Sequence, residues 1–502
     1  MKILTRIKKN SLNPALFLVG LLLLSLLVKG QPGPQGIRYQ HGYDTSVGSP
    51  FESSNSSARY ALTEAIAKYH TIYFDIQEAV FSLPDLAGHG ERYYPIFTPG
   101  ISFLAVPFYW LGNLFGYPQI GAYFSTLIIS LLDIFLIAKI SQKLGGGKVA
   151  SLLGGFTFLF ATNALSYSLT LTQHLAGSFV ILLAILSLTW DRNFKNNLIF
   201  GVLVGIGALF DIPNVLALLP ALFYVLSRHI HIAEYSNRLK ISIRPSLFVL
   251  ALGVLPLVAV FFWYNLATTG SALSVAQFGG RVKSFQPVNI APKASIVHGP
   301  QLLTYNPREM VQGLYILIVS NERGWFYYNP IIAVGLLGLI LGYRKSQSKS
   351  FFVLLFSTIL MIIVPYSMFG DPWGGWSFGA RYLIPASAVA CIGIGLAVSY
   401  IRPKILLPFI FIPLLALSLY INILGALTTA QIPPKQEAQY LSTHIPYTYK
   451  YNQQLIKNDT SSLAYHLLFS DYVTPQTYFY LYLGLLLVGL TGLFIYSLFE
   501  KP

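Results

Sequence analysis

The acidic residues of this chain are concentrated in one segment near its N-terminus. Between residues 30 and 118 lie Asp44, Glu52, Glu64, Asp75, Glu78, Asp85 and Glu91. The apolar stretches that make up most of the remaining chain hold almost no ionisable residue apart from Asp133, whose role the sequence leaves open. An ion-coupled transporter would be expected to carry charges inside such stretches. We therefore expect the chemistry of the chain at this segment, where a carboxylate is suited to proton transfer.

Two arginines in later polar segments are candidates for anion binding. Arg323 lies in the segment Asn-Glu-Arg-Gly-Trp-Phe, and Arg381 follows Trp373-Gly-Gly-Trp376 at the start of an apolar stretch. A planar guanidinium can hold two oxygens of a phosphate at once. The alternative for Arg381 is an anchor among lipid head groups, and Trp376 is either an interfacial belt residue or a platform for a sugar ring.

The composition places these residues in a membrane protein. Of the 502 residues, 54% are hydrophobic and only 10% are charged, which is too little charge for the surface of a soluble domain of this size. Apolar stretches of roughly 15 to 23 residues recur along the chain, close to the length that a bilayer-crossing helix requires. They lie at about 12–29, 119–138, 149–166, 175–190, 197–211, 213–228, 246–264, 328–343, 351–368, 382–400, 405–425 and 476–498. We therefore predict an all-α polytopic protein with about 12 transmembrane helices, in a single integral membrane domain over 1–502.

The basic residues predict the orientation of these helices. Suppose that the apolar run 101–116 only dips into the membrane interface. Most basic residues outside segment 30–118 then lie on the same side of the membrane as the four basic residues at the N-terminus. By the positive-inside rule that side is cytoplasmic and includes both termini, and we predict that the membrane is the plasma membrane. Segments 30–118, 265–327 and 426–475 are then extracytoplasmic. The net charge of +15 is explained by topology, so we predict no nucleic-acid partner.

Two interfacial helices are expected within the first loop. Ala58, Ala61, Leu62, Ala65, Ile66 and Tyr69 recur at helical spacing, with Arg59, Thr63, Glu64 and Lys68 on the opposite side. Ser56 or Ser57 is suited to cap this helix, which is too short to span and is predicted to lie along the membrane surface. Together with the apolar run 101–116 it would roof a cavity at the bilayer edge.

Several short motifs, in this order, resemble the GT-C membrane glycosyltransferases of the glycosyltransferase family 39-like type, in particular protein O-mannosyltransferases and aminoarabinose transferases. Arg59-Tyr60-Ala61 looks like the Arg-Tyr-Ala of the latter. Tyr93-Tyr94 through Pro99-Gly100 looks like an aromatic element of the family, and the segments around Arg323 and Trp376 to Arg381 resemble outer-loop motifs of a bacterial branch. The resemblance implies a GT-C-like fold, and it suggests Arg59, Tyr60, Tyr93, Tyr94, Arg323, Trp376 and Arg381 as substrate-binding residues.

The resemblance implies transfer of a sugar from a polyprenyl-phosphate-linked donor to a lipid, glycan or protein acceptor outside the cytoplasm. A base must take the acceptor's proton, and positive charge must hold the departing phosphate. Where the aminoarabinose transferases carry Asp-Glu just before Arg-Tyr-Ala, however, this chain has Ser56-Ser57. Phe97 or Thr98 likewise stands where a phosphate-contacting lysine is expected. We therefore expect Asp44, or next Glu52, or Asp85 to supply the carboxylate from a rearranged loop.

Two rival functions remain at this stage. A flippase or transporter of lipid-linked saccharide would show internal pseudo-repeats, and we detect none. A catalytically inactive relative is the second rival, because of the missing Asp-Glu pair. The single cysteine, Cys391, excludes an intrachain disulfide, and no spacing suggests a metal site. The cofactor is therefore unknown, and a divalent cation stays open.

Overall fold

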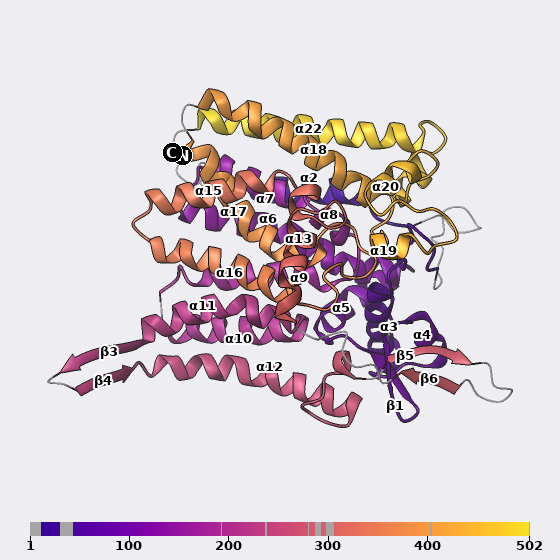
Figure 1. Ribbon diagram of the computed structural model, residues 1–502, viewed down its shortest axis with the longest axis horizontal. Coiled ribbons are helices and arrows are strands. Elements are labelled where there is room, and N and C mark those ends of the chain that lie inside the picture. Colours follow the sequence, from indigo (N-terminus) through magenta and orange to yellow (C-terminus); the bar gives the residue numbers. More distant parts are fainter. Residues whose placement is uncertain are drawn as a thin grey trace.

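The computed structural model describes residues 12–30, 44–191, 193–235, 238–279, 281–286, 293–297, 306–401 and 404–500. Long helices dominate it and run side by side (Figure 1). The longer helices are α2 (Leu12–Ser25), α3 (Ser54–Tyr69), α5 (Gly100–Leu114), α6 (Pro118–Lys143), α7 (Lys148–Phe160), α9 (Gln173–Ser187), α10 (Phe194–Phe210), α11 (Pro213–His229), α12 (Ser246–Thr269), α13 (Met310–Ile318), α15 (Ile332–Lys345), α16 (Lys349–Ser367), α17 (Ile384–Tyr400), α18 (Leu407–Leu427) and α22 (Pro475–Phe499).

Short elements fill the segments between them. The short α-helices are α4 (Ile76–Phe81), α8 (Ala164–Ser168), α14 (Trp325–Tyr328), α19 (Lys435–Ala438), α20 (Lys450–Leu455) and α21 (Leu463–Leu468). The 3-10 helices are η1 (Ala276–Phe278), η2 (Pro307–Glu309), η3 (Arg381–Leu383) and η4 (Lys404–Leu406). The strands are β1 (Leu86–His89), β2 (Arg92–Pro95), β3 (Ile230–Tyr235), β4 (Arg238–Ile243), β5 (Arg281–Gln286) and β6 (Lys293–Val297).

Each apolar stretch predicted from the sequence contains a helix, so the helical polytopic class is confirmed. Among the described residues, six helical segments are long and apolar enough to cross a bilayer by themselves. They are Pro118–Lys143, Ser246–Thr269, Lys349–Ser367, Arg381–Tyr400, Lys404–Leu427 and Pro475–Phe499. The chain is an integral membrane protein, and the total of about 12 crossings stays a prediction. Asp133, in the middle of α6, is fully buried.

The helix ends gather at two opposite ends of the bundle. At one end, Val149 N donates to Glu500 over 2.9 Å, and Lys345 Nζ donates to Tyr400 O over 3.2 Å. At the other, Lys29 after α2 contacts Glu52, and Tyr123 in the first turns of α6 donates to Pro50 O over 2.8 Å. Because the end of α2 and the start of α6 meet the same loop, α5 between them does not cross the bundle. That the run 101–116 is not a full span of the membrane stays a prediction.

Helix α3 forms as predicted, but its surroundings differ from the prediction. Arg59 and Thr63, expected to face water, are 1% and 0% exposed, whereas Tyr69 is 50% exposed. The reason is α5, which packs on the side of α3 that looked polar: Ser102 Oγ donates to Arg59 O over 2.9 Å. The cap also differs, because the helix begins at Ser54 and Ser53 is its N-cap. The helix is therefore buried on most sides, and Arg59 is an internal cation.

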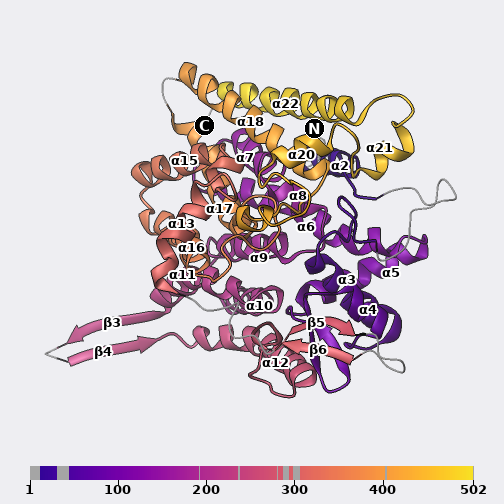
Figure 2. The ribbon, with the colours of Figure 1, turned by 45° about the vertical axis from the view of Figure 1, so that its right-hand side comes forward.

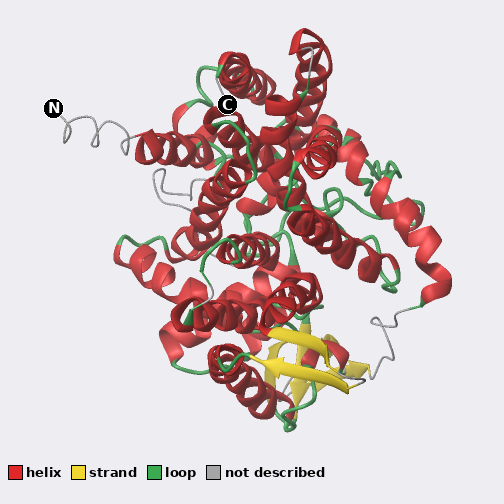
Figure 3. Ribbon diagram, turned by 90° about the vertical axis from the view of Figure 1, so that its left-hand side faces the viewer, coloured by secondary structure: helices red, strands yellow, loops and turns green. Residues whose placement is uncertain are grey.

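Two small sheets, which the sequence analysis did not predict, extend from the helices. A four-stranded sheet has the order β2-β1-β5-β6 and is antiparallel throughout, with Ala87 of β1 opposite Arg281 of β5. It joins the first loop to the segment after α12. Figure 3 shows that the strands are confined to the lower part of an otherwise helical molecule. The β3–β4 hairpin projects from the opposite end of the bundle (Figures 1 and 2).

Glycines allow the central helices to approach closely. Gly338 of α15 and Gly393 of α17 face each other so that a Cβ on either one would collide with backbone of the other helix. Small residues at such crossings give the backbone contact that replaces the hydrophobic drive inside a bilayer. Helix α17, buried over nearly its whole length, is thereby held in the middle of the bundle, with Arg381 at its N-terminal end.

Candidate functional site

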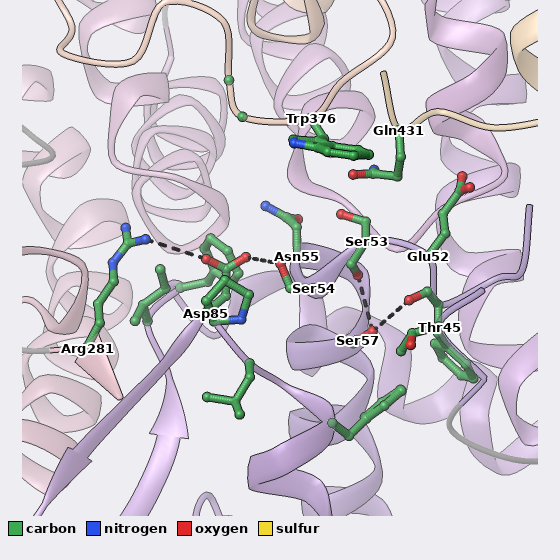
Figure 4. Close-up of a pocket in the computed structure, with 18 of the residues that line it drawn as sticks. Thr45, Glu52, Ser53, Ser54, Asn55, Ser57, Asp85, Arg281, Trp376 and Gln431 are labelled. Atoms are coloured by element: carbon green, nitrogen blue, oxygen red, sulfur yellow. Dashed lines mark hydrogen bonds and ion pairs between the residues drawn. The ribbon is translucent and has the colours of Figure 1, made fainter. Parts of the chain in front are cut away.

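A cavity of about 1090 Å³ lies where the first loop meets the segments after α12, α16 and α18 (Figure 4). Its wall includes three carboxylates, two arginines, a tryptophan and several amide side chains. These are Glu52, Asp85 and Asp371, then Arg281 and Arg381, then Trp376, and then Asn55, Gln77, Gln277 and Gln431. Of the predicted site residues, Glu52, Asp85, Trp376 and Arg381 therefore line one cavity.

Asp85 is a half-open carboxylate at this cavity. It lies just before β1, and its Oδ2 accepts a hydrogen bond of 2.7 Å from Ser54 Oγ at the start of α3. Its Oδ1 is 3.8 Å from Nη1 of Arg281, and 16% of its side chain is exposed. Figure 4 shows Asp85 between these two partners. The carboxylate that the sequence lacks directly before Arg59 is thus brought to the start of α3 from another part of the loop.

Arg59 is a buried cation immediately behind the cavity wall. Its Nη1 donates to the side-chain oxygen of Asn55, its guanidinium carbon lies 3.9 Å from the centre of the Phe97 ring, and its Nε has no hydrogen-bond partner among the described residues. Burial lowers the pKa of Arg59 to about 10, and Asp211 and Asp85 act against this shift. Arg59 therefore stays charged at neutral pH. Phe97, which stands where a lysine was expected, supports this guanidinium.

The turn that precedes Arg381 in the chain positions this residue at the cavity. Asp371 accepts hydrogen bonds from Gly374 N (3.1 Å) and Gly375 N (2.7 Å), and both glycines have positive φ, at 71° and 62°. A Cβ at Gly374 would lie 2.9 Å from Nε of Arg381. Only glycine fits there. Among the described residues, neither Arg381 nor Arg59 forms an ion pair with a carboxylate within 4 Å.

Glu52 is different, because its hydrogen-bonding capacity is already used. Oε1 accepts from Lys29 Nζ (2.5 Å) and from Ala430 N (2.9 Å), and Oε2 accepts from Gly48 N (2.8 Å) and from Thr429 Oγ1 (2.5 Å). The side chains of Glu52 and Lys29 are 2% and 1% exposed. This arrangement joins the end of α2, the first loop and the segment after α18. It is the arrangement of a structural ion pair, and Glu52 has no lone pair left for an acceptor hydroxyl.

The hydrogen-bond donors of Arg323 are likewise already used, by backbone carbonyl groups. Its guanidinium donates to the carbonyls of Trp373 (2.9 Å), Gly375 (3.0 Å), Ile432 (2.8 Å) and Glu322 (2.8 Å). It is fully buried and does not line the cavity. Burial lowers its pKa. We predicted Arg323 as a substrate contact, and the structure instead gives it the position of a clamp that holds the Trp373–Trp376 turn against residue 432.

The remaining predicted residues lie outside the cavity. Asp44 accepts from Ser46 N over 2.9 Å and lines a smaller cavity of about 130 Å³ with Asp459. Tyr60 packs against Phe51, with ring centres 5.0 Å apart. Tyr93 pairs with Gly88 in the sheet, and Tyr94 is buried in a small apolar cluster beneath it, where burial raises its pKa to about 12. Their predicted roles at a substrate site gain no support from this placement.

Several cavity residues were missed by the sequence reasoning. Arg281 reaches the site only because β5 pairs with β1, and no local pattern indicates that pairing. Asn55 and Gln431 are single amides in unremarkable segments. Asp371 had a signal: Asp followed by Pro-Trp-Gly-Gly is typical of a turn in which the side chain accepts backbone N–H groups. The described residues contain no group of three or more His, Cys, Asp or Glu side chains placed to hold a metal ion.

Comparisons with known proteins find similarity among solved structures. No family model matches the chain, and no curated protein matches its sequence. Among solved structures, it is similar to ArnT from Cupriavidus metallidurans in the apo state, with 15% identity, a TM-score of 0.48, and coverage of 97% of this chain and 77% of that chain. The same protein bound to undecaprenyl phosphate has 13% identity, the same TM-score and the same coverages.

The archaeal oligosaccharyltransferase of Archaeoglobus fulgidus in the apo form is also similar, with 14% identity and a TM-score of 0.45, over 93% of this chain and 61% of that chain.

Proposed function

We propose that this protein is a membrane glycosyltransferase that moves a sugar from a polyprenyl-phosphate carrier to an acceptor at the extracytoplasmic face. The observation that carries the proposal is the cavity at the end of the bundle, where one half-open carboxylate, Asp85, lies with Arg381 and Arg281 beside the N-terminus of a central helix. A carboxylate together with cations in one polar cavity is what glycosyl transfer from a phosphate carrier requires.

Asp85 is the general base of this mechanism. Its Oδ2 is held by Ser54, while Oδ1 lies beyond hydrogen-bond distance from Arg281 and retains lone pairs for an acceptor hydroxyl. Asp44 and Glu52, which ranked ahead of Asp85 in the sequence analysis, are less suited. One lies at another cavity and the other has four donors.

Arg381 holds the carrier phosphate as negative charge grows on the bridging oxygen. It stands at the N-terminal end of α17, where backbone N–H groups and the helix dipole also favour an anion. Arg59, kept charged behind the wall, adds positive potential without contacting the phosphate. The stabilisation is largest in the transition state, because the charge on the leaving oxygen is then greatest.

The topology is a further part of the proposal. We propose that segments 30–118, 265–327 and 426–475 face outward and that the β3–β4 hairpin and both termini face the cytoplasm. Single cysteines at 458 and 240, introduced in a Cys391→Ser background, should distinguish the two sides in intact cells. An impermeant maleimide should label position 458 and not position 240, and the reverse pattern would invert the arrangement.

Transfer itself is tested with purified protein and radiolabelled polyprenyl-phosphate sugars. Loss of label from the lipid that requires Asp85 would support the proposed glycosyltransferase activity. Stable lipid donors that cross reconstituted vesicles without losing the label would favour a flippase instead. If the label neither leaves the lipid nor crosses the vesicle membrane, the protein is an inactive relative.

A further inference from the structure

Beside the charged residues, the cavity has an uncharged portion. Trp376 and Gln431 lie on one side of it, and Ser53 and Asn55 face them from the start of α3 (Figure 4). The indole nitrogen of Trp376 donates to Glu437 over 2.6 Å, which fixes the plane of the ring. An aromatic face opposite amide and hydroxyl side chains suits a sugar, because the ring's C–H face packs on the indole while its hydroxyls meet the polar groups.

The orientation of the Asn55 amide is determined by Arg59. A guanidinium only donates hydrogen bonds, so the Asn55 atom that Arg59 Nη1 contacts must be the oxygen. Asn55 is 5% exposed, lines the cavity, and its Nδ2 has no hydrogen-bond partner among the described residues. The group that this amide presents to the cavity is therefore a pure donor.

Because Asn55 Nδ2 only donates hydrogen bonds and the Arg59 cation lies behind it, this group favours some ligands over others. A hydroxyl or a carbonyl oxygen accepts from Nδ2, whereas a protonated amine has no lone pair to offer and is also repelled by Arg59. Three carboxylates line the cavity. Glu52 is saturated and paired with Lys29, and Asp371 is bonded through both oxygens to the glycine turn. Asp85 is ion-paired with Arg281 and is assigned to the acceptor hydroxyl in the proposed mechanism, so it is not assigned to the donor sugar.

We propose that Asn55, held by Arg59, makes this cavity specific for an uncharged sugar and excludes a sugar that carries a protonated amine. The inference rests on the proposed glycosyl transfer and names the class of sugar. Asn55 is thus a specificity-determining residue, and Trp376 and Gln431 form the opposite wall of the same subsite.

The test compares two donors that share one polyprenyl phosphate: one carries a neutral hexose and the other an amino-deoxypentose. The wild-type protein should transfer the hexose with the higher kcat/KM. In Asn55→Asp, one carboxylate oxygen still accepts from Arg59 and the other faces the cavity as an acceptor. The ratio of kcat/KM for the two donors should then shift toward the amino sugar by roughly ten- to a hundred-fold, as expected for one charge-assisted hydrogen bond.

Asn458→Asp is the matched control, because it makes the same chemical change at an exposed residue outside this cavity. Its ratio should equal that of the wild type. Asn55→Ala should lower hexose transfer without gaining the amino sugar, and thermal unfolding of each variant identifies a protein that has not folded.

Equal or better use of the amino sugar by the wild type would overturn the inference even if Asn55→Asp fails to fold. An unchanged ratio in a folded Asn55→Asp would overturn it as well. Failure of the wild type to release either sugar would instead refute the proposed transfer itself, so the two failures are distinguishable.

Discussion

The charged residues at two walls of the same cavity differ in their hydrogen bonds. At one wall lies Glu52, with Lys29 and Arg323 behind the cavity surface, and each of these charges is buried and hydrogen-bonded. At the other wall lie Asp85 and Arg381, with Arg59 behind them, and these charges keep unused donors or lone pairs. A saturated charge holds segments together, and an unsaturated charge beside a cavity is available to a ligand. In our proposal, hydrogen-bond completeness therefore separates the structural charges at this cavity from the functional ones.

The largest effect on turnover is expected from Asp85→Asn. Loss of a general base reduces rates by roughly 10²- to 10⁴-fold, while Ser54 can still donate to the remaining side-chain oxygen, so the fold should persist. Label transfer and thermal unfolding measured on one preparation give both quantities. Near wild-type turnover in a folded Asp85→Asn would remove the base from this wall.

Glu52→Gln should have the opposite profile. Removing one partner of a buried ion pair leaves Lys29 as an uncompensated charge, which typically costs about 3 to 5 kcal/mol of stability. Lys29→Met combined with Glu52→Gln should recover part of that loss, because no charge is then left unpaired. A stable Glu52→Gln with abolished transfer would reverse the assignment of Glu52 and Asp85.

Arg381→Lys and Arg323→Lys compare the same substitution on the two walls. At Arg381 the loss of a bidentate phosphate contact, about 1.5 to 3 kcal/mol, should slow kcat by roughly ten- to a hundred-fold with little change in unfolding temperature. At Arg323 the ammonium cannot reach the four carbonyls, so stability should fall. If Arg381→Lys is fully active, Arg381 is only a head-group anchor.

The smallest expected effect concerns Glu78, a carboxylate outside the cavity whose hydrogen bonds are incomplete. One of its oxygens, Oε1, has no hydrogen-bond partner among the described residues, and burial raises its pKa to about 7 from an ordinary value of 4.5. The folded protein then binds the proton more tightly than the unfolded chain. Stability from this group is present below about pH 4.5 and is lost as the pH rises through about 7.

Glu78→Gln should flatten that dependence while keeping the helix cap, because glutamine can also accept the hydrogen bond from Asp75 N. Unfolding temperatures measured across this pH range, with transfer assayed at one pH, check both parts. An altered turnover at unchanged stability would show that a carboxylate outside the cavity also acts in the reaction.

Much of the architecture follows from the sequence alone. Apolar length and charge distribution determined the helical membrane class, because a bilayer core accepts only segments whose backbone is hydrogen-bonded internally. The same information indicated that the run 101–116 does not cross. Asp85 was identified as a candidate because it is one of the acids of the first loop, and Trp376 and Arg381 because they belong to a motif that resembles the family and precedes an apolar stretch.

Which of these candidates face one another was decided only by the tertiary structure. Arg59 is buried because α5 covers the polar side of α3, and Arg281 reaches Asp85 because β5 pairs with β1. Both contacts join residues far apart in sequence, so no local periodicity records them. The saturation of Glu52 depends on partners near residues 29 and 430. Whether a carboxylate is structural or reactive is a property of its neighbours, and this chain assembles those neighbours only when its loop segments fold over the helix ends.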